Sequence, residues 1–278
     1  MTDLLDASEP TTTSSAPSSP AERPRSTVTF RSGSIRSGSR LVDLHLAAGR
    51  DLDVLITPTG RTVVVVPHPD DEALAAGGLI AHQRARGREV VVVAVTDGDA
   101  AYPDWDGTHL ARVRRREQLD ALHRLGVGRH AVHRLGIPDG ATSHHVDEIS
   151  TALLDILHPG DTLVAPAVFD WHPDHEACGR AATAAADEIG CSLFGSLFWA
   201  HHHPDHAPSG LSLALLALSD DEVAQRRAAV HAHRSQLEPS PHTSADPILP
   251  SDLLGLLERP VEYYVLERCA TLRPGGVA

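Results

Sequence analysis

The chain has 278 residues, of which 41% are hydrophobic, and carries a formal net charge of −13. This length allows one large α/β domain or two small ones, the apolar content supports a sizeable core, and we expect one main domain. The acidic balance argues against nucleic acid as a partner, because phosphates need a basic surface. No apolar run is long enough to span a bilayer, so no membrane span is expected.

The cysteines and the first residues bear on the compartment. Cys178, Cys191 and Cys269 are scattered without a Cys-x-x-Cys pair, which favours neither a disulfide framework nor a thiolate zinc site. The first six residues lack the basic start and apolar middle of a secretory signal. We therefore expect a cytoplasmic protein.

The N-terminal segment differs in composition from the rest of the chain. Residues 1–40 are rich in Ser, Thr, Pro and Arg without apolar periodicity, which predicts a disordered or loosely ordered segment. Residues 41–278 are expected to form a single α/β domain. Within it, Leu41–Ile56 alternates apolar and polar residues around Gly49, which predicts a hairpin at the sheet edge.

From residue 61 onward, apolar strand-like runs alternate with helical patterns. This alternation predicts a Rossmann-like, mostly parallel α/β sheet with helices on both faces and the active site at the C-terminal ends of the strands. A further helix is expected at Asp221–His233 and an edge strand at Val261–Glu267. The expected strands are Arg61–Val66, Glu89–Thr96, Ala131–Leu135, Thr162–Pro166 and Leu193–Trp199, and the expected helices are Glu72–Arg86, Leu110–Gly126, Val146–Leu157 and Glu176–Ile189.

Two polar clusters follow two of these strands. The run Val63–Val66 stops in Pro67–Glu72, which contains a histidine and three consecutive carboxylates. The second cluster, Trp171–His175, follows the apolar run that begins at Thr162. Either cluster alone could be a turn with a capping Asp, but strand ends of a parallel sheet meet at one edge. The two clusters could therefore converge on one metal ion.

The residue types in these clusters suit a catalytic metal. Two imidazoles and one carboxylate bind Zn²⁺ while leaving a position open for water, and His68, Asp71 and His175 form such a set. The same set also accepts Fe²⁺ or Co²⁺, so other divalent transition metals are possible.

The neighbours of these three residues are candidates for catalysis. Asp70, beside a ligand, could take a proton from the attacking water as general base. His172 as an imidazolium could stabilise an oxyanion or protonate a leaving amine. Asp174 would orient one of the histidines.

A second tetrapeptide of the same type occurs at His203–His206. It could compete with His175 for the third ligand position. We prefer His175, because an Ala-rich helical stretch follows it at once, whereas His206 runs into a Pro-Ser-Gly loop.

The two clusters resemble the signatures of the LmbE-like (PIG-L) deacetylases, in which an apolar strand leads into His-Pro-Asp-Asp-Glu. Here that pattern is Pro67–Glu72, and His172–His175 matches the second signature. The resemblance continues through Thr96–Gly98, Arg114–Glu117 and Leu135–Gly140, and covers roughly residues 60–237. It implies a zinc-dependent hydrolase that removes an acyl group, usually acetyl, from an N-acetylglucosamine-type sugar, with a small-molecule amino-sugar conjugate as substrate.

Carried over position by position, the resemblance gives the same roles as the residues themselves. His68, Asp71 and His175 become the zinc ligands, Asp70 the general base and His172 the polarising residue. Reaction would occur by direct attack of water, without a covalent enzyme intermediate.

The resemblance also implies that Arg114 and Asp139 bind sugar hydroxyls, with Asp97 a further candidate for the pocket. Each has a structural alternative: Arg114 could lie on a solvated helix face, and Asp139 and Asp97 could belong to ordinary turns. Arg234–Gln236 resembles a helix-end element of the family and receives no role.

Other classes of function remain to be weighed. A nucleotide-binding oxidoreductase would need Gly-x-Gly-x-x-Gly after the first strand, where this chain has His-Pro-Asp-Asp-Glu. A noncatalytic α/β binding module would tolerate a broken ligand set, but all three ligand candidates and the base are present. The closest alternative is an amidase of the same superfamily that cleaves a larger acyl group from a sugar conjugate.

Overall fold

The computed structural model describes residues 27–28, 39–55, 57–249 and 253–268. Most of the 1–40 segment therefore lies outside the described residues, and its predicted disorder stays a prediction. The division into this segment and one domain over 41–278 also stays a prediction. No helix in the described part of the chain is long and apolar enough to cross a membrane.

The described strands form one nine-stranded sheet in the order β1-β2-β8-β9-β7-β6-β3-β4-β5. Its centre is parallel: β3 pairs with β6 on one side and β4 on the other, and β7 extends β6 in the same direction. The predicted mostly parallel α/β sheet is thus confirmed. The strands are β1 (Thr27–Val28), β2 (Leu52–Val54), β3 (Thr62–Val66), β4 (Val90–Ala94), β5 (Val132–Arg134), β6 (Thr162–Pro166), β7 (Ser192–Ser196), β8 (Leu213–Ala217) and β9 (Val261–Arg268).

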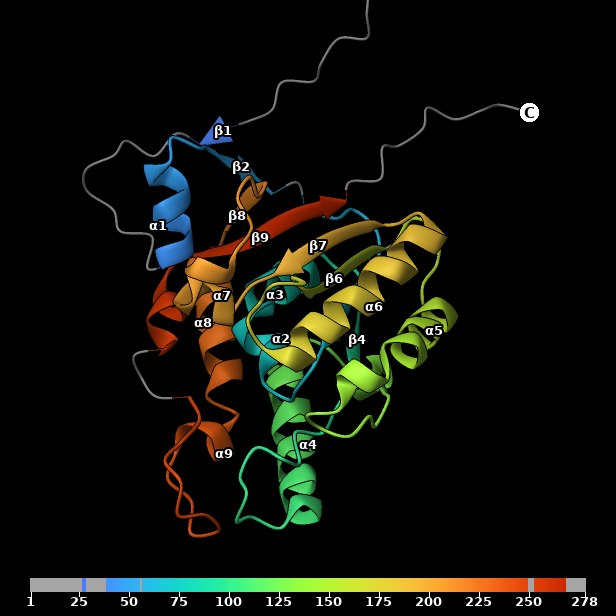
Figure 1. Cartoon of the computed structure of the whole chain (residues 1–278), viewed down its shortest axis with the longest axis vertical. Helices are drawn as coiled ribbons and strands as arrows, with labels where there is room; N and C mark the ends of the chain where they lie inside the picture. The colour runs from blue at the N-terminus through green and yellow to red at the C-terminus, as the bar shows by residue number, and fades with distance from the viewer. Residues whose placement is uncertain (1–26, 29–38, 56, 250–252, 269–278) are drawn as a thin grey trace, which may run out of the picture.

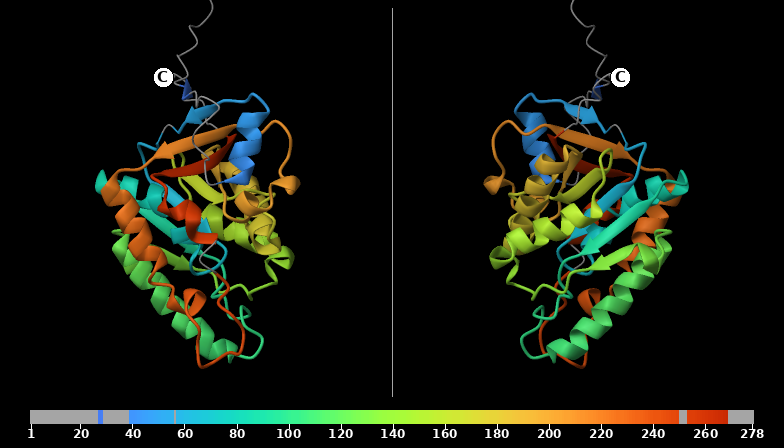
Figure 2. Two further views of the ribbon diagram at one scale, coloured as in Figure 1. Left: turned by 90° about the vertical axis from the view of Figure 1, so that its left-hand side faces the viewer. Right: turned by 90° about the vertical axis from the view of Figure 1, so that its right-hand side faces the viewer.

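Helices cover both faces of the sheet (Figures 1 and 2). One face carries α3, α4 and α8, and the other carries α5 and α6, with α1 and α7 beside them. Short 3-10 segments lie at Arg129–Ala131, Thr142–His144, Pro204–His206 and Leu253–Glu258. The helices are α1 (Arg40–Ala47), α2 (Asp71–Leu74), α3 (Gly77–Ala85), α4 (Gly107–Arg124), α5 (Val146–Ile156), α6 (Pro173–Ile189), α7 (Trp199–His202), α8 (Asp220–Val230) and α9 (Arg234–Leu237).

The valine runs of β3 and β4 explain why this sheet has a core on each side. Val64 and Val66 pack into the core beneath α3, α4 and α8, whereas Val63 and Val65 pack beneath α5 and α6. Successive strand side chains point to opposite faces, so a continuous apolar run fits only a strand that is covered twice.

The expected hairpin at residues 41–56 is wrong. This segment forms helix α1 followed by strand β2. Ser39 caps the helix by accepting a hydrogen bond from the Val42 backbone N–H at 3.2 Å. Leu41, Val42 and His45 are the buried residues of α1, a helical spacing that outweighs the local alternation.

The C-terminal strand is also placed differently from the prediction. β9 is not an edge strand, because it lies between β7 and β8 and pairs antiparallel with both. β8 was not expected from the sequence. Its Leu213–Ala217 run follows a loop rather than a helix, so the strand–helix alternation gave no signal for it.

The single helix expected over Glu72–Arg86 is interrupted at Ala75 and Ala76. The second part, α3, begins where Glu262 of β9 accepts hydrogen bonds from the backbone N–H groups of Gly78 (2.5 Å) and Leu79 (2.8 Å). A β-carbon on Gly78 would overlap both Leu218 and the Glu262 carboxylate. The start of α3 is therefore fixed by a distant strand, and α2 is left as a short turn that carries Asp71.

Candidate active site

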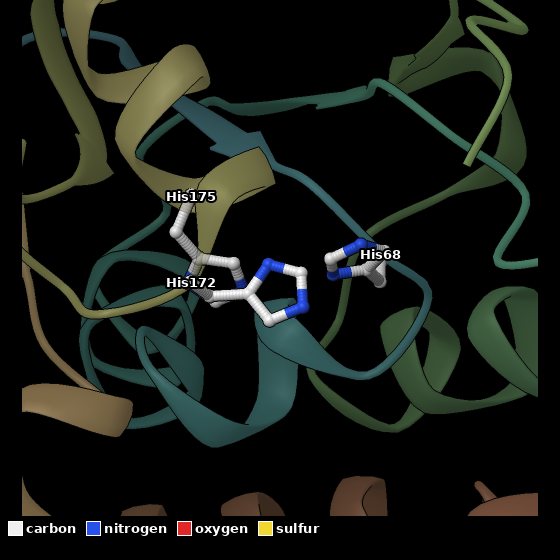
Figure 3. Close-up of side chains that lie close together, drawn as sticks. All are labelled: His68, His172 and His175. Carbon is white, nitrogen blue, oxygen red and sulfur yellow. The ribbon is translucent and has the colours of Figure 1, made fainter. Parts of the chain in front are cut away.

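The two polar clusters meet at the C-terminal edge of the parallel strands. His68 lies in the turn between β3 and α2, and His172 and His175 lie at the start of α6, which follows β6. Figure 3 shows the three imidazoles facing one another across this edge. The ring centroids of His68 lie 4.9 Å from those of His172 and 5.5 Å from those of His175. Residues about 100 positions apart are thereby joined in one site, because β3 and β6 are adjacent.

Asp71 lies between the two histidines that the sequence selects as ligands. Its Oδ2 atom is 3.3 Å from Nδ1 of His68 and 3.3 Å from Nε2 of His175. The same oxygen accepts a hydrogen bond from the His68 backbone N–H at 2.9 Å, which fixes the carboxylate. One carboxylate and two imidazole nitrogens therefore converge from two strand ends.

The opposite nitrogen of each of these imidazoles is held by a further carboxylate. Asp174 Oδ2 lies 3.0 Å from Nε2 of His68, and Asp170 Oδ2 lies 2.8 Å from Nδ1 of His175. Each carboxylate accepts a hydrogen bond from the ring N–H on its side, which leaves His68 Nδ1 and His175 Nε2 facing Asp71.

These carboxylates are themselves fixed by hydrogen bonds. Asp174 accepts from Gly140 N (3.0 Å) and from the Thr142 hydroxyl (2.5 Å). Asp170 Oδ1 accepts from the backbone N–H groups of Phe198 (3.0 Å) and Ala200 (2.9 Å). The orientation of both imidazoles thus depends on loops that follow β5 and β7.

The charges at this edge suit a cation. Burial lowers the pKa of His68, but Asp139, Asp174 and Asp71 together raise it well above its ordinary value. Burial likewise opposes the charge on His175, yet Asp71 and Asp170 raise its pKa to about 9. Carboxylates that stabilise protons on imidazoles also stabilise a metal ion that replaces those protons.

An unsatisfied atom points to the same conclusion. Nε2 of His175 is buried and has no hydrogen-bond partner, although Asp71 Oδ2 is nearby. A buried polar nitrogen without a partner is costly, and metal coordination would satisfy it. The donors of His68, Asp71 and His175 thus fit a metal such as Zn²⁺, which takes His nitrogen and carboxylate oxygen.

Two overlapping groups of potential metal ligands lie here, and within each group the ligand atoms are within 4.8 Å of one another. One joins the three histidines, His68, His172 and His175, and the other joins His68 with Asp139 and Asp174. In the second group the carboxylates lie on the Nε2 side of His68, at 3.2 Å for Asp139 and 3.0 Å for Asp174. Because two carboxylates accept hydrogen bonds from the Nε2–H of His68, its Nδ1 atom is the better candidate to coordinate a metal.

Asp70 is held in a strained and buried position beside Asp71. Its φ is 135°, a value rare for a residue with a side chain, and such strain costs about 1–3 kcal/mol. Burial raises the pKa of its carboxyl to about 6, against the lowering effect of Arg114, whose Nη2 lies 3.2 Å from Oδ2. A carboxyl with this pKa is ionised at neutral pH and is a stronger base than an exposed aspartate.

His172 presents a neutral imidazole rather than the imidazolium that the sequence suggested. Burial, followed by repulsion from His175 and His68, lowers its pKa to about 4. Its Nδ1 accepts a hydrogen bond from the Asp174 backbone N–H at 3.2 Å, which leaves the ring proton on Nε2. The residue can therefore offer an N–H to a developing oxyanion without carrying a charge.

A cavity of about 320 Å³ opens over these residues. Its lining includes the carboxylates and imidazoles described above, and its outer wall comes from loops far along the chain. The lining residues are His68, Asp70, Asp71, Leu74, Ala100, Ala101, Arg114, Asp139, Gly140, His172, Asp174, His175, Trp199, Gln236, Ile248 and Leu249.

The three residues expected to bind sugar hydroxyls fall into different places. Arg114 and Asp139 line the cavity, and Arg114 is buried rather than on a solvated helix face, donating to the carbonyls of Gly98 and Pro69. Asp97 does not line it. Its carboxylate is taken up by Arg115 and by Arg134, the latter at 2.7 Å.

The His203–His206 tetrapeptide forms no ligand cluster within the described residues. The ring of His203 stacks on Trp171 with centroids 3.5 Å apart and planes at 18°. The first candidate for the third ligand position, His175, is the one that lies beside Asp71.

Comparison with known proteins decides the family. Residues 63–186 match the family model described as PIG-L, GlcNAc-PI de-N-acetylase. Residues 63–186 form a PIG-L family domain. The matched range spans β3 to α6 and contains His68, Asp71 and His175, so the resemblance noted in the sequence is confirmed.

The alignment with similar proteins extends beyond residues 63–186. The chain is 28% identical over 269 residues to 1D-myo-inositol 2-acetamido-2-deoxy-alpha-D-glucopyranoside deacetylase of Mycolicibacterium gilvum, covering 76% of this chain and 92% of that protein. It is 28% identical over 134 residues to the probable N-acetyl-alpha-D-glucosaminyl L-malate deacetylase 2 of Bacillus subtilis, covering 45% of this chain but only 60% of that protein.

A solved structure shares the fold of the PIG-L domain. The N,N'-diacetylchitobiose deacetylase of Pyrococcus horikoshii superposes with a TM-score of 0.52 at 24% identity, covering 64% of this chain and 71% of that chain. This likeness supports the α/β architecture described above.

Several residues at this site or directly behind it were missed from the sequence. Asp170, which holds His175, stands two positions before His172, where a carboxylate near a ligand could have been noticed. Gln236 is fully buried, lines the cavity and has an Oε1 atom without a partner, although the sequence gave it no role. Ile248 and Leu249 have no chemical signature, because only the fold brings them to the cavity.

Proposed function

We propose that this protein is a metal-dependent hydrolase that removes an N-acetyl group from an amino-sugar conjugate. The observation that carries the proposal is the position of Asp71 Oδ2, 3.3 Å from both His68 Nδ1 and His175 Nε2, on the wall of a cavity that also contains Asp70. The names of the similar proteins support the reaction, since both similar sequences are called deacetylases of N-acetylated glucose derivatives.

His68, Asp71 and His175 would hold the metal, for which we propose Zn²⁺ on the basis of the donor set. When bound there, the ion supplies a Lewis acid that lowers the pKa of water toward about 7 and polarises a carbonyl oxygen. Asp170 and Asp174 fix the two imidazoles so that their lone pairs stay directed to one point.

The chain's own groups then carry the protons. Asp70, with its raised pKa, takes the proton of the attacking water as the oxygen approaches the amide carbon. His172 donates a hydrogen bond from its Nε2–H to the carbonyl oxygen as negative charge develops there. The departing amine receives its proton from Asp70, which holds the proton taken from the water, since His172 could supply one only as an imidazolium.

The wall of the cavity offers contacts for the sugar. Arg114 and Asp139 lie beside Asp70 and His68 and are assigned to sugar hydroxyls. Gln236 adds an Oε1 atom that has no hydrogen-bond partner. Its Nε2 donates a hydrogen bond to the Ser235 hydroxyl at 2.9 Å. Glu117 in turn accepts from both the N–H and the hydroxyl of Ser235, so the Gln236 amide is held in place.

The proposal is tested by acetate release from a panel of N-acetylated sugars and their glycosides. Zinc-loaded wild type, chelated protein and Asp70→Ala are compared, with Asp155→Ala, at an exposed position of α5, as the matched control. We expect release to require metal and to fall roughly 10²–10⁴-fold in Asp70→Ala, because a positioned base is lost. Metal content should stay near that of wild type.

Two outcomes would contradict the proposal. If no divalent metal binds stoichiometrically, the ligand assignment fails. If metal binds but no acetyl group is released from any sugar of the panel, the site survives and the acetyl-sugar assignment gives way to cleavage of a larger acyl group.

A further inference from the structure

Trp171 lies on the surface although it is the largest kind of side chain. It is 43% exposed and has a φ of 60°, a left-handed conformation that bulky residues rarely adopt. It belongs to the loop between β6 and α6, directly before His172. The backbone of this loop thus presents an indole ring to water at the position next to the catalytic cluster.

The Trp171 ring packs against the histidine-rich segment that follows β7. His203 stacks on one face of Trp171 with centroids 3.5 Å apart, and His206 lies at 5.6 Å with its ring tilted by 46°. Since His203 covers one face, the exposed area belongs to the other face and the edge of the indole. Two loops therefore fix one aromatic plane.

This plane lies next in the chain to residues that line the cavity. His172, the next residue after Trp171, lines the cavity, as does Trp199, which lies one helical turn before His203 and whose carbonyl accepts the His203 backbone N–H at 2.9 Å. The rings of His172 and Trp199 are themselves stacked at 6.3 Å. The Trp171–His203 stack therefore neighbours the His172–Trp199 pair through both chain segments.

We propose that the exposed face of Trp171 is a second subsite, which binds the sugar ring attached to the N-acetylated sugar. The cavity, about 320 Å³, is at the lower end of the roughly 300–1,000 Å³ typical of ligand pockets, and Trp171 is not among its lining residues, so a ring stacked on Trp171 would lie outside it. The electron-rich face of an indole attracts the positively polarised C–H groups of a pyranose ring. This inference rests on the proposed function.

The test compares a two-ring with a one-ring substrate. kcat/KM for acetate release is measured with N,N'-diacetylchitobiose and with N-acetylglucosamine, using zinc-loaded wild type, Trp171→Ala and Trp171→Phe. We expect Trp171→Ala to lower the disaccharide-to-monosaccharide ratio of kcat/KM about 5- to 10-fold, the scale of a lost ring contact. Trp171→Phe, which retains an aromatic face, should restore most of the ratio.

Val168→Ala is the matched control. Val168 lies in the same loop, is 39% exposed and is also apolar, but it is not stacked on a histidine. Its ratio should stay at the wild-type value. An equal loss with both substrates in Trp171→Ala, or an equal fall of the ratio in Val168→Ala, would overturn the subsite.

A binding measurement separates this inference from the proposed function. Calorimetric titration with chitobiose and with glucosamine, which carry no acetyl group, needs no turnover. We expect wild type to bind chitobiose more tightly than glucosamine and Trp171→Ala to lose this difference. If wild type makes no such difference, the subsite is wrong even when acetate is released; if the difference is present without acetate release, only the proposed reaction fails.

Discussion

Asp170 Oδ2 lies 2.8 Å from Nδ1 of His175, and both residues are fully buried. Asp170→Asn would keep the size of the side chain and an oxygen for the two backbone N–H groups, but it would place an NH₂ group against the His175 ring. The imidazole would then lose its preferred tautomer. We expect metal affinity to fall about 10–100-fold.

Metal affinity of this variant can be measured by competition with a chelator. Asp155→Asn, at an exposed position, is the control. Wild-type affinity in Asp170→Asn would show that the carboxylate does not orient the ligand.

Gly98→Ala should disturb Arg114. Gly98 has a φ of +64°, and a β-carbon there would overlap Nη1 of Arg114, the group that donates to the Gly98 carbonyl at 3.0 Å. The guanidinium would be displaced from Asp70. We expect the free energy of unfolding to fall by more than the roughly 1–2 kcal/mol of left-handed strain alone, and kcat to fall with it.

Gly87→Ala separates the two effects. Gly87 has a similar φ of +69°, and a β-carbon there would meet nothing within 4 Å. Chemical denaturation and kcat should therefore show strain without loss of activity in this control. Equal losses in the two variants would rule out a specific contact with Arg114.

Glu262→Ala should destabilise the start of α3. The carboxylate accepts from Gly78 N, Leu79 N and the Tyr264 hydroxyl, and it faces Arg226 at 3.4 Å. Its removal leaves a buried guanidinium and two helix N–H groups without this acceptor. We expect a loss of about 3–5 kcal/mol in the free energy of unfolding.

The exposed pair Arg227–Glu258 provides the comparison, since both side chains are about half exposed. Glu258→Ala should change stability by at most about 1 kcal/mol, because water screens surface ion pairs. Similar losses in both variants, measured by urea denaturation, would contradict the structural role of Glu262.

Stability should depend on pH through His201. Burial, followed by the nearby His202, lowers the pKa of His201 to about 3 from the ordinary 6.5. Between these values the unfolded chain binds a proton that the folded chain does not. The contribution of the neutral His201 ring to the free energy of unfolding is therefore complete above pH 6.5. It is lost as the pH falls toward 3, with a slope of up to about 1.4 kcal/mol per pH unit.

His201→Asn removes this titration. Urea denaturation between pH 6.5 and pH 4 should give a shallower loss of stability in the variant than in wild type. His130→Asn, at an exposed position, should retain the wild-type slope. Parallel pH profiles for His201→Asn and wild type would show that the ring is not held neutral by burial.

The sequence determined the parts of the fold whose signals are local. Val63–Val66 is apolar without interruption, which only a strand covered on both faces tolerates, and the chemistry follows where that strand ends. The same reasoning applied to Thr162–Pro166 located the second cluster. The sequence could therefore predict one common site for His68, Asp71 and His175, because parallel strands end at a common edge.

Only the tertiary structure decided the features that depend on non-local contacts. The position of β9 between β7 and β8 and the break before α3 depend on residues far away in the sequence. Asp170 is close in sequence to His175, but only the fold turns its carboxylate toward that ring. The burial of Arg114 and the pairing of Asp97 with arginines likewise depend on which side of a turn faces the core. Residue type specifies what a side chain can bind, whereas packing determines what it meets.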